Sequence, residues 1–238
     1  MHRPIVALLL FASSGAAMAQ NPPPPPQGLS GKVAFGYLAT SGNSKSDNLN
    51  LSFNGRYDAA PWHHSLDGLA VKASANDVDT AEAYRLSWNT QRDLAGASYV
   101  FGFVGWNQDE FSSYARQLRE SIGYGRRFID RARQTLSAEA GAGYRRADLR
   151  DGTSESEAIA RLAVDYRLTL SETSDFSQRL SIESGSSNTY LESTSALRTD
   201  IWKNIGLVLS YTIKRNSSVP VGLKKRDTFT AVSLEYSF

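Results

Sequence analysis

The last stretch of the chain, "TFTAVSLEYSF" at residues 228–238, alternates strictly between two sets of side chains. One set is mostly apolar and the other mostly small or polar: Thr228, Thr230, Val232, Leu234, Tyr236 and Phe238 against Phe229, Ala231, Ser233, Glu235 and Ser237. Successive side chains of a β-strand point to opposite faces, so this stretch predicts a strand with one apolar face. Chain ends are usually poorly ordered. The terminal phenylalanine therefore indicates that this strand is held in place.

The same alternation with a period of two recurs along the whole chain from Gly31 onward. It is clearest at residues 49–57, 84–90, 136–144, 160–168 and 205–213. Turn signals divide the chain into roughly a dozen strands of about ten to thirteen residues, longer than typical globular strands and suited to a tilted bilayer crossing. We therefore predict an all-β fold in which residues 31–238 form a single antiparallel transmembrane β-barrel of about twelve strands.

The polar face of these strands decides between a soluble sheet protein and a membrane barrel. In a soluble sandwich or lipocalin-like barrel the polar face meets water, whereas in an outer-membrane barrel it lines the lumen. Here that face carries small residues, such as Ser52, Gly141 and Ser233, interspersed with arginines. Such a mixture fits a confined interior. An open sheet edge in hydrocarbon leaves backbone groups unpaired, so the first strand is expected to pair with the last.

Aromatic side chains are expected in two rows at the two water–lipid boundaries. Placing the strand ends from the turn signals groups Tyr37, Tyr84, Trp106, Tyr144, Tyr190 and Tyr211 at one boundary and Tyr57, Trp88, Tyr99, Phe128, Trp202 and Phe238 at the other.

The N-terminal segment indicates export. Residues 1–19 combine Arg3, an apolar run and the small residues Ala17 and Ala19, which predicts a cleaved signal peptide. Residues 20–30 contain five consecutive prolines and are expected to form a stiff periplasmic tether. The chain has no cysteine and a formal net charge of +2, which excludes disulfides and thiolate metal sites and gives no reason to expect a nucleic-acid partner.

The ending with Leu234, Tyr236 and Phe238 resembles the C-terminal signature of bacterial outer-membrane barrels. Together with "GKVAFGYLATSGNSKSDNLNLSFNGRY" near the front, residues 30–238 resemble the YdiY-like family of outer membrane proteins, a family of unknown function described as salt-induced. The resemblance implies a Gram-negative outer membrane and recognition of the C-terminal signature by the barrel assembly machinery after escort by periplasmic chaperones. It carries no catalytic residues. Outer-membrane lipid and lipopolysaccharide are the expected surroundings, with Lys224–Arg226 as candidate contacts to phosphate groups.

The charged residues on the predicted inner face are the candidate functional set. They comprise eight arginines and four carboxylates: Arg56, Arg85, Arg119, Arg145, Arg161, Arg167, Arg179, Arg198, Glu139, Asp165, Glu183 and Glu235. In one interpretation they pair across strands and plug a non-conducting structural barrel. In the other they line a narrow, porin-like channel whose arginines favour small anionic solutes. The family description adds a role in envelope or osmotic adaptation.

An outer-membrane lipid hydrolase is the remaining alternative. His63 and Ser65 lie two apart on one strand face, a spacing that would let the histidine take the serine proton. Their expected place at the periplasmic end is wrong for attack on outer-leaflet lipid, so we predict that the protein is not an enzyme. Adjacent His63 and His64 point to opposite faces and phosphate-loop or zinc motifs are not seen, so neither a metal nor a cofactor is expected.

Overall fold

The structure is a computed structural model that describes residues 28–40, 46–76, 78–110, 114–150, 152–219 and 225–238. The predicted signal peptide, nearly all of the proline-rich tether, and Lys224 lie outside these ranges. Every regular element in the described part is a β-strand, and the twelve strands are β1 Gly28–Thr40, β2 Ser46–Ala59, β3 Trp62–Ala75, β4 Val78–Asp93, β5 Ser98–Asp109, β6 Tyr114–Arg131, β7 Gln134–Leu149, β8 Ser154–Thr169, β9 Ser174–Ser184, β10 Thr189–Trp202, β11 Ile205–Asn216 and β12 Arg226–Ser237. Among the described residues, no helix is long and apolar enough to cross a membrane.

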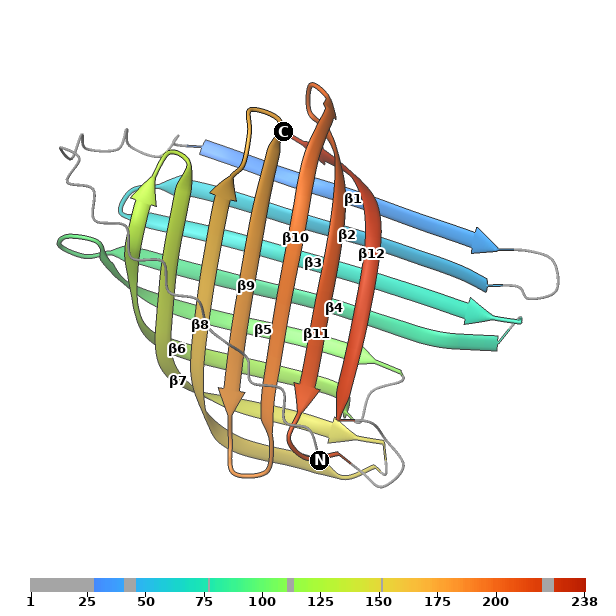
Figure 1. Ribbon diagram of the computed structural model, residues 1–238. Coiled ribbons are helices and arrows are strands. Elements are labelled where there is room, and N and C mark those ends of the chain that lie inside the picture. Colours follow the sequence, from blue (N-terminus) through green and yellow to red (C-terminus); the bar gives the residue numbers. More distant parts are fainter. Residues whose placement is uncertain (1–27, 41–45, 77, 111–113, 151, 220–224) are drawn as a thin grey trace, which may run out of the picture.

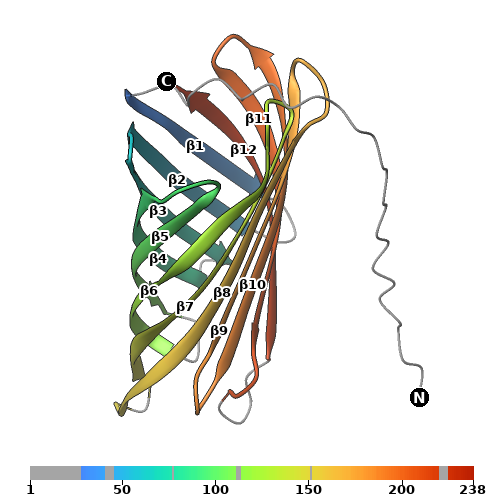
Figure 2. The same cartoon turned by 90° about the vertical axis from the view of Figure 1, so that its left-hand side faces the viewer.

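The strands form one closed antiparallel barrel in which each strand pairs with its neighbours in sequence (Figures 1 and 2). The predicted pairing of the first strand with the last is confirmed. Lys32 to Phe35 of β1 pair with Ser237 to Leu234 of β12, and the backbones of Gly31 and Phe238 exchange two hydrogen bonds of 2.9 Å. Strand β1 begins at Gly28, three residues before the expected start of the barrel.

The two ends of the barrel differ in their connections. Turns at 60–61, 94–97, 132–133, 170–173 and 203–204 lie at the end that holds the start of β1 and the C-terminus. Bacterial outer-membrane barrels place their short turns in the periplasm. We therefore refer to this end as periplasmic and to the opposite end as extracellular.

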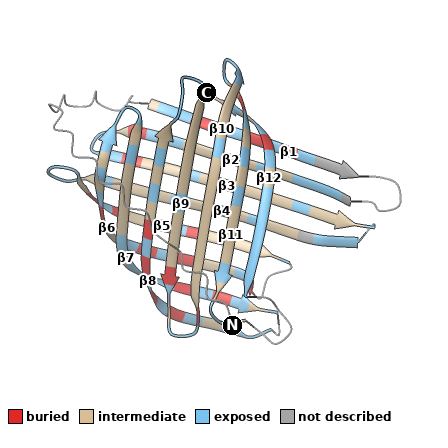
Figure 3. Cartoon of the chain, in the orientation of Figure 1, coloured by how far each residue is buried: buried red, intermediate tan, exposed pale blue. Residues whose placement is uncertain are grey.

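The outer wall of the barrel is apolar, as the alternation predicts. Large hydrophobic side chains are exposed on most strands of the wall, for example Phe35 on β1, Leu86 on β4, Leu162 on β8 and Leu209 on β11. Figure 3 shows this surface as bands of exposed residues alternating along the strands. Two polar groups on this wall satisfy one another, since Gln178 Nε2 of β9 donates to Ser193 Oγ of β10 at 2.9 Å.

Several strands are longer than expected, and in β6 the reason is local. The strands have 11 to 18 residues, and β6 is the longest. The β6–β7 register shifts between Tyr114 and Arg116 and again between Arg127 and Ile129. Such bulges add residues to one strand and increase its twist, so β6 follows a curved path that an evenly alternating segment would not need.

Two of the twelve aromatic side chains expected at the lipid boundaries belong elsewhere. Tyr99 is 2% exposed and Tyr190 lines a recess inside the barrel. Both occupy inward positions of their strands. For Tyr99 the reason is the register with β6: its ring lies over Gly125, and a methyl group at Gly125 would be 2.3 Å from the ring carbons. The missing side chain of Gly125 leaves room for the ring inside the barrel.

Candidate functional site in the barrel lumen

The strand register places all twelve charged residues of the candidate set on the inward face. Buried or part-buried carboxylates meet arginines from several strands there, but the twelve do not form a single cluster. Most of them fall into a buried central group, an extracellular group and a periplasmic group, and the last two groups also contain charged residues outside the predicted set.

The central group is an ion triad made of Arg119 on β6, Arg161 on β8 and Glu183 on β9. Arg119 Nη1 lies 3.3 Å from Glu183 Oε2, and Arg161 Nη1 lies 3.0 Å from Glu183 Oε1. Glu183 is fully buried, and the Nε atoms of both arginines are buried without a hydrogen-bond partner. Two guanidinium groups share one carboxylate, so the triad carries a net positive charge and spare donors.

Aromatic rings fill the lumen next to this triad. Tyr99 and Phe101 of β5 point inward and are almost completely buried, and Phe103 lies 4.2 Å from the Arg161 guanidinium, ring centroid to Cζ. Glycines on the facing strands make room for these rings, since a methyl group at Gly141 would lie 2.9 Å from the Phe101 ring. Most of the buried residues of the barrel lie on β5 to β9 (Figure 3). This side of the lumen is therefore packed.

The lumen is hollow elsewhere. Arg179 of β9 and Asp165 of β8 face inward and form an ion pair, with Nε 3.0 Å from Oδ1. Their side chains are nevertheless 64% and 55% exposed. Inward side chains can be exposed to this degree only where solvent-accessible space remains inside the barrel. Arg167, which is also exposed, faces the same space.

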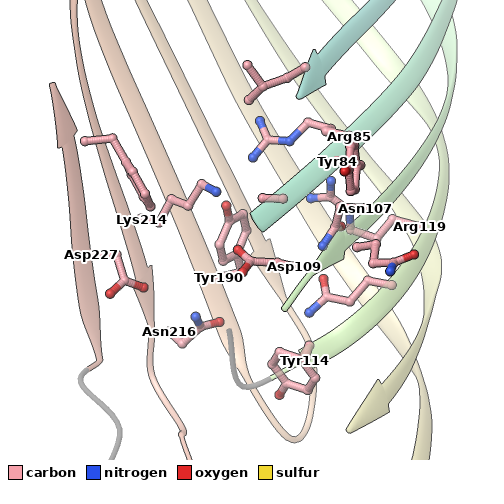
Figure 4. Close-up of a pocket in the computed structure, with 15 residues that line it drawn as sticks. Tyr84, Arg85, Asn107, Asp109, Tyr114, Arg119, Tyr190, Lys214, Asn216 and Asp227 are labelled. Carbon is pink, nitrogen blue, oxygen red and sulfur yellow. The ribbon is translucent and has the colours of Figure 1, made fainter. Parts of the chain in front are cut away.

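A recess opens on the extracellular side of the triad and holds about 640 Å³ of space, open solvent included (Figure 4). Residues from seven strands line it, among them Arg85, Arg119, Tyr190, Lys214 and Phe229. The Arg85 guanidinium binds the Glu192 carboxylate in a bidentate pair of 2.7 and 3.0 Å, and the Tyr190 hydroxyl donates to the same carboxylate. The recess therefore has a rigid, hydrogen-bonded floor.

Lys214 stands apart from this floor. Its ammonium group lies 4.9 Å from the centroid of the Phe229 ring, and it forms no ion pair with any residue in the part of the chain that the structure describes. Figure 4 shows Lys214 reaching from β11 toward Arg85 and Tyr190. No carboxylate of the described residues contacts it, although Asp109 and Asp227 also line the recess.

A second buried ion pair lies between β7 and β8 toward the extracellular end of the barrel. Arg145 of β7 binds Glu157 of β8, and Arg145 Nη2 also donates to the Asn188 carbonyl at 3.1 Å. Glu157 accepts further hydrogen bonds from Ser187, at 2.8 Å from both its backbone N–H and its hydroxyl. The 185–188 turn is thereby tied to the barrel wall.

The periplasmic end has two ionic networks. In one, Arg198 Nε lies 2.7 Å from Glu235 Oε1, and Lys32 lies 3.0 Å from the same carboxylate oxygen. In the other, His63 lies between two carboxylates, with Nδ1 2.6 Å from Asp58 and Nε2 2.9 Å from Asp93. Both His63 ring nitrogens are engaged, so neither is free to accept a proton from Ser65.

The remaining predicted residues join the edges of these networks. Arg56 Nε donates to Asp58 at 2.7 Å, and Glu139 accepts hydrogen bonds from Gln91 at 3.1 Å and Tyr99 at 3.3 Å. The candidate set omitted Asp58, Glu157, Glu192 and Lys214. All four occupy inward positions in the alternation of their strands. Extending the alternation to the strand ends would therefore have found them.

The C-terminal residues lie at the closing seam. Leu234, Tyr236 and Phe238 are each 52% exposed on the outer wall. The Phe238 ring packs over Gly31, where a methyl group would lie 2.5 Å from it, and its centroid is 6.3 Å from that of Tyr236. Their recognition by the assembly machinery stays a prediction.

A closed antiparallel barrel with an apolar exterior and an ionic interior defines an outer-membrane β-barrel protein. The chain belongs to the family described as "Protein of unknown function, DUF481", which it matches over residues 33–238. It is 31% identical over 208 residues to "Uncharacterized protein YdiY" of Escherichia coli (strain K12), covering 87% of this chain and 82% of that protein. The resemblance to the YdiY-like family is thereby confirmed.

Solved structures support the same fold. An outer membrane channel from Pseudomonas putida F1 superposes with a TM-score of 0.54 at 10% identity, covering 94% of this chain and all of that one (100%). The translocator domain of the autotransporter NalP from Neisseria meningitidis superposes with a TM-score of 0.51 at 11% identity, covering 90% and 89% of the two chains. At such low identity the likeness concerns the fold alone.

Proposed function

We propose that this outer-membrane barrel is a narrow, non-enzymatic channel for small solutes, with a preference for anions. The observation that carries the proposal is the Arg179–Asp165 pair, which faces the lumen and yet is exposed over more than half of each side chain. A structural barrel plugged by its own side chains would bury such a pair. Water can therefore occupy at least part of the interior, as conduction requires.

The anion preference rests on the triad. Arg119 and Arg161 share the single carboxylate of Glu183, and each keeps a buried N–H without an acceptor. These groups are buried, so the triad acts on a passing ion through its net positive charge, which attracts an anion and repels a cation. Arg119 also lines the extracellular recess, so an anion that enters from outside reaches this group first.

Single-channel recording in planar lipid bilayers tests the proposal. We expect small openings and, under a salt gradient, a reversal potential that indicates anion selectivity. Arg161→Gln should move the anion-to-cation permeability ratio toward unity, because it removes one of the two guanidinium charges. Lys203→Gln in the exposed 203–204 turn serves as the matched control and should leave the ratio unchanged. A folded barrel that never opens at any voltage would instead support the non-conducting structural role.

A further inference from the structure

The outer wall carries a stack of rings at the periplasmic ends of β2, β3 and β4, which lie side by side (Figure 1). The His64 ring is at its centre, 6.2 Å from the Trp62 ring and 6.1 Å from the Trp88 ring, centroid to centroid. The Tyr57 ring of β2 lies 6.4 Å from the His64 ring. The tyrosine and both tryptophans are exposed on the outer wall. The stack therefore faces lipid at the periplasmic water–lipid boundary, where aromatic rings are favoured.

Arg92 of β4 adds a positive charge at the periplasmic end of this stack. It lies directly opposite Trp62 in the strand register, and its Cζ atom is 5.8 Å from the centroid of the Trp62 ring. Arg92 is exposed, and no carboxylate of the described residues forms an ion pair with it. Asp58 and Asp93, at the same end of β2 and β4, face the lumen instead and both bind His63. The guanidinium group is therefore available on the lipid-facing side of the wall.

The stack also contains two ring N–H groups that can donate to a ligand. The Thr90 hydroxyl lies 2.9 Å from His64 Nδ1 and occupies that nitrogen. When Nδ1 accepts from Thr90, the proton of the neutral ring is on Nε2. Neither this N–H nor the indole N–H of Trp62 has an acceptor among the residues that the structure describes. Donors from Arg92, Trp62 and His64 thus lie on two consecutive outward rows of the sheet.

We propose that this surface binds the headgroup of an anionic glycerophospholipid in the periplasmic leaflet. The phosphodiester oxygens would accept hydrogen bonds from Arg92 and from the free ring N–H groups of Trp62 and His64. The acyl chains would lie on the apolar wall, which Leu66 and Leu86 continue toward the middle of the bilayer. A zwitterionic headgroup also carries an ammonium group, which Arg92 repels. The site is on the outside of the barrel, so the proposal does not depend on conduction.

Native mass spectrometry of the full exported chain, released from detergent micelles, tests this inference. The probes are phosphatidylglycerol and phosphatidylcholine with the same acyl chains. We expect the first phosphatidylglycerol molecule to bind more tightly than phosphatidylcholine. Arg92→Met should raise the dissociation constant of this first molecule about tenfold, the loss expected for one hydrogen bond to a charged group. Trp62→Leu should also weaken binding, because it removes both the ring and its N–H.

Arg126→Met is the matched control. Arg126 is exposed at the periplasmic end of β6, so the variant loses the same charge, but no ring of the described residues lies against it. Binding should stay at wild-type level, and the heat-dependent gel mobility of each variant reports whether it has folded. If Arg92→Met proves unfolded, His64→Phe keeps a ring in the stack, removes the N–H and should still weaken binding. Equal binding of the two lipids, equal losses for the two arginine variants, or displacement of the lipid by glycerol 3-phosphate would each overturn the proposal.

Discussion

At the scale of single residues, Glu183 is the side chain on which the interior depends most. It is fully buried and neutralises both Arg119 and Arg161. We expect Glu183→Ala to lower the free energy of unfolding by about 3–5 kcal/mol, because two buried guanidinium groups would lose their counter-charge. Reversible urea unfolding in phosphatidylcholine vesicles, followed by tryptophan fluorescence, measures this change.

The Arg179–Asp165 pair provides the matched control for that measurement. It has the same chemistry and also faces the lumen, but both side chains are more than half exposed. Asp165→Ala should therefore cost only about 0–1 kcal/mol, as is usual for solvated ion pairs. Equal losses for the two variants would mean that Glu183 is not the buried centre that the structure indicates.

Sequence alternation can place a charge on the inward face but cannot name its partner. Arg85 and Glu192 are 107 positions apart and meet only because the barrel closes and brings β4 and β10 across the lumen from one another. The same holds for Arg119 and Glu183, which are 64 positions apart. The side of the barrel wall on which a side chain lies follows from its odd or even position along the strand. Its partner across the lumen depends on barrel diameter, strand tilt and side-chain length together.

At the scale of elements, glycines on β6 and β7 permit the sharp curvature of that corner. A methyl group at Gly143 would lie 1.9 Å from the carbonyl oxygen of Glu120 on the paired strand. We expect Gly143→Ala to force these strands apart and to lower the free energy of unfolding by about 1–3 kcal/mol, as overpacking does. Urea titration of the vesicle-embedded protein would show the effect as a lower midpoint.

Gly68 of β3 is the appropriate comparison. A methyl group there would only touch Phe53, at 3.9 Å. Gly68→Ala should leave stability unchanged or raise it by about 0.5–1 kcal/mol, because alanine loses less backbone entropy than glycine on folding. A midpoint for Gly143→Ala equal to that of Gly68→Ala would argue against close strand packing at the β6–β7 corner.

Strand existence and order follow from the alternation and the turn residues, because antiparallel neighbours need only short connections. The inward placement of Tyr99 and Tyr190 does not follow from them. An aromatic ring near a strand end suits the lipid boundary as well as it suits the lumen. Which of the two it occupies depends on the residue that lies opposite it on the paired strand. Tyr99 is opposite Gly125, which leaves space for its ring inside the barrel.

At the scale of the whole molecule, apolar groups lie outside and ionic groups inside. This arrangement explains why the charged residues are predictable as a set, while the extent of the closing seam is not. In the described part of the chain, strand β1 pairs with β12 only at Lys32 to Phe35. The alternation on β12 continues beyond these pairs, although Phe229 takes an inward position and Thr230 an outward one. Odd and even positions along one strand do not report where its partner diverges, since divergence results from the curvature of the entire barrel.

The inverted arrangement itself can be tested with two neighbouring positions on β11. Leu209 is 49% exposed on the outer wall, two residues from Tyr211 and well inside the apolar band, whereas Ser210 points inward between Ala196 and Ala231. Leu209→Arg should lower the free energy of unfolding in vesicles by about 2–4 kcal/mol, the cost of an arginine facing the middle of the bilayer. Ser210→Arg adds the same charge to a hydrated lumen lined there by small side chains and should cost much less. A reversed order of the two losses would contradict this arrangement, and so would a wild-type chain that stays folded and monomeric in buffer without lipid or detergent. The result on β11 applies to every strand, because the continuous register around the barrel fixes which side chains of each strand point outward.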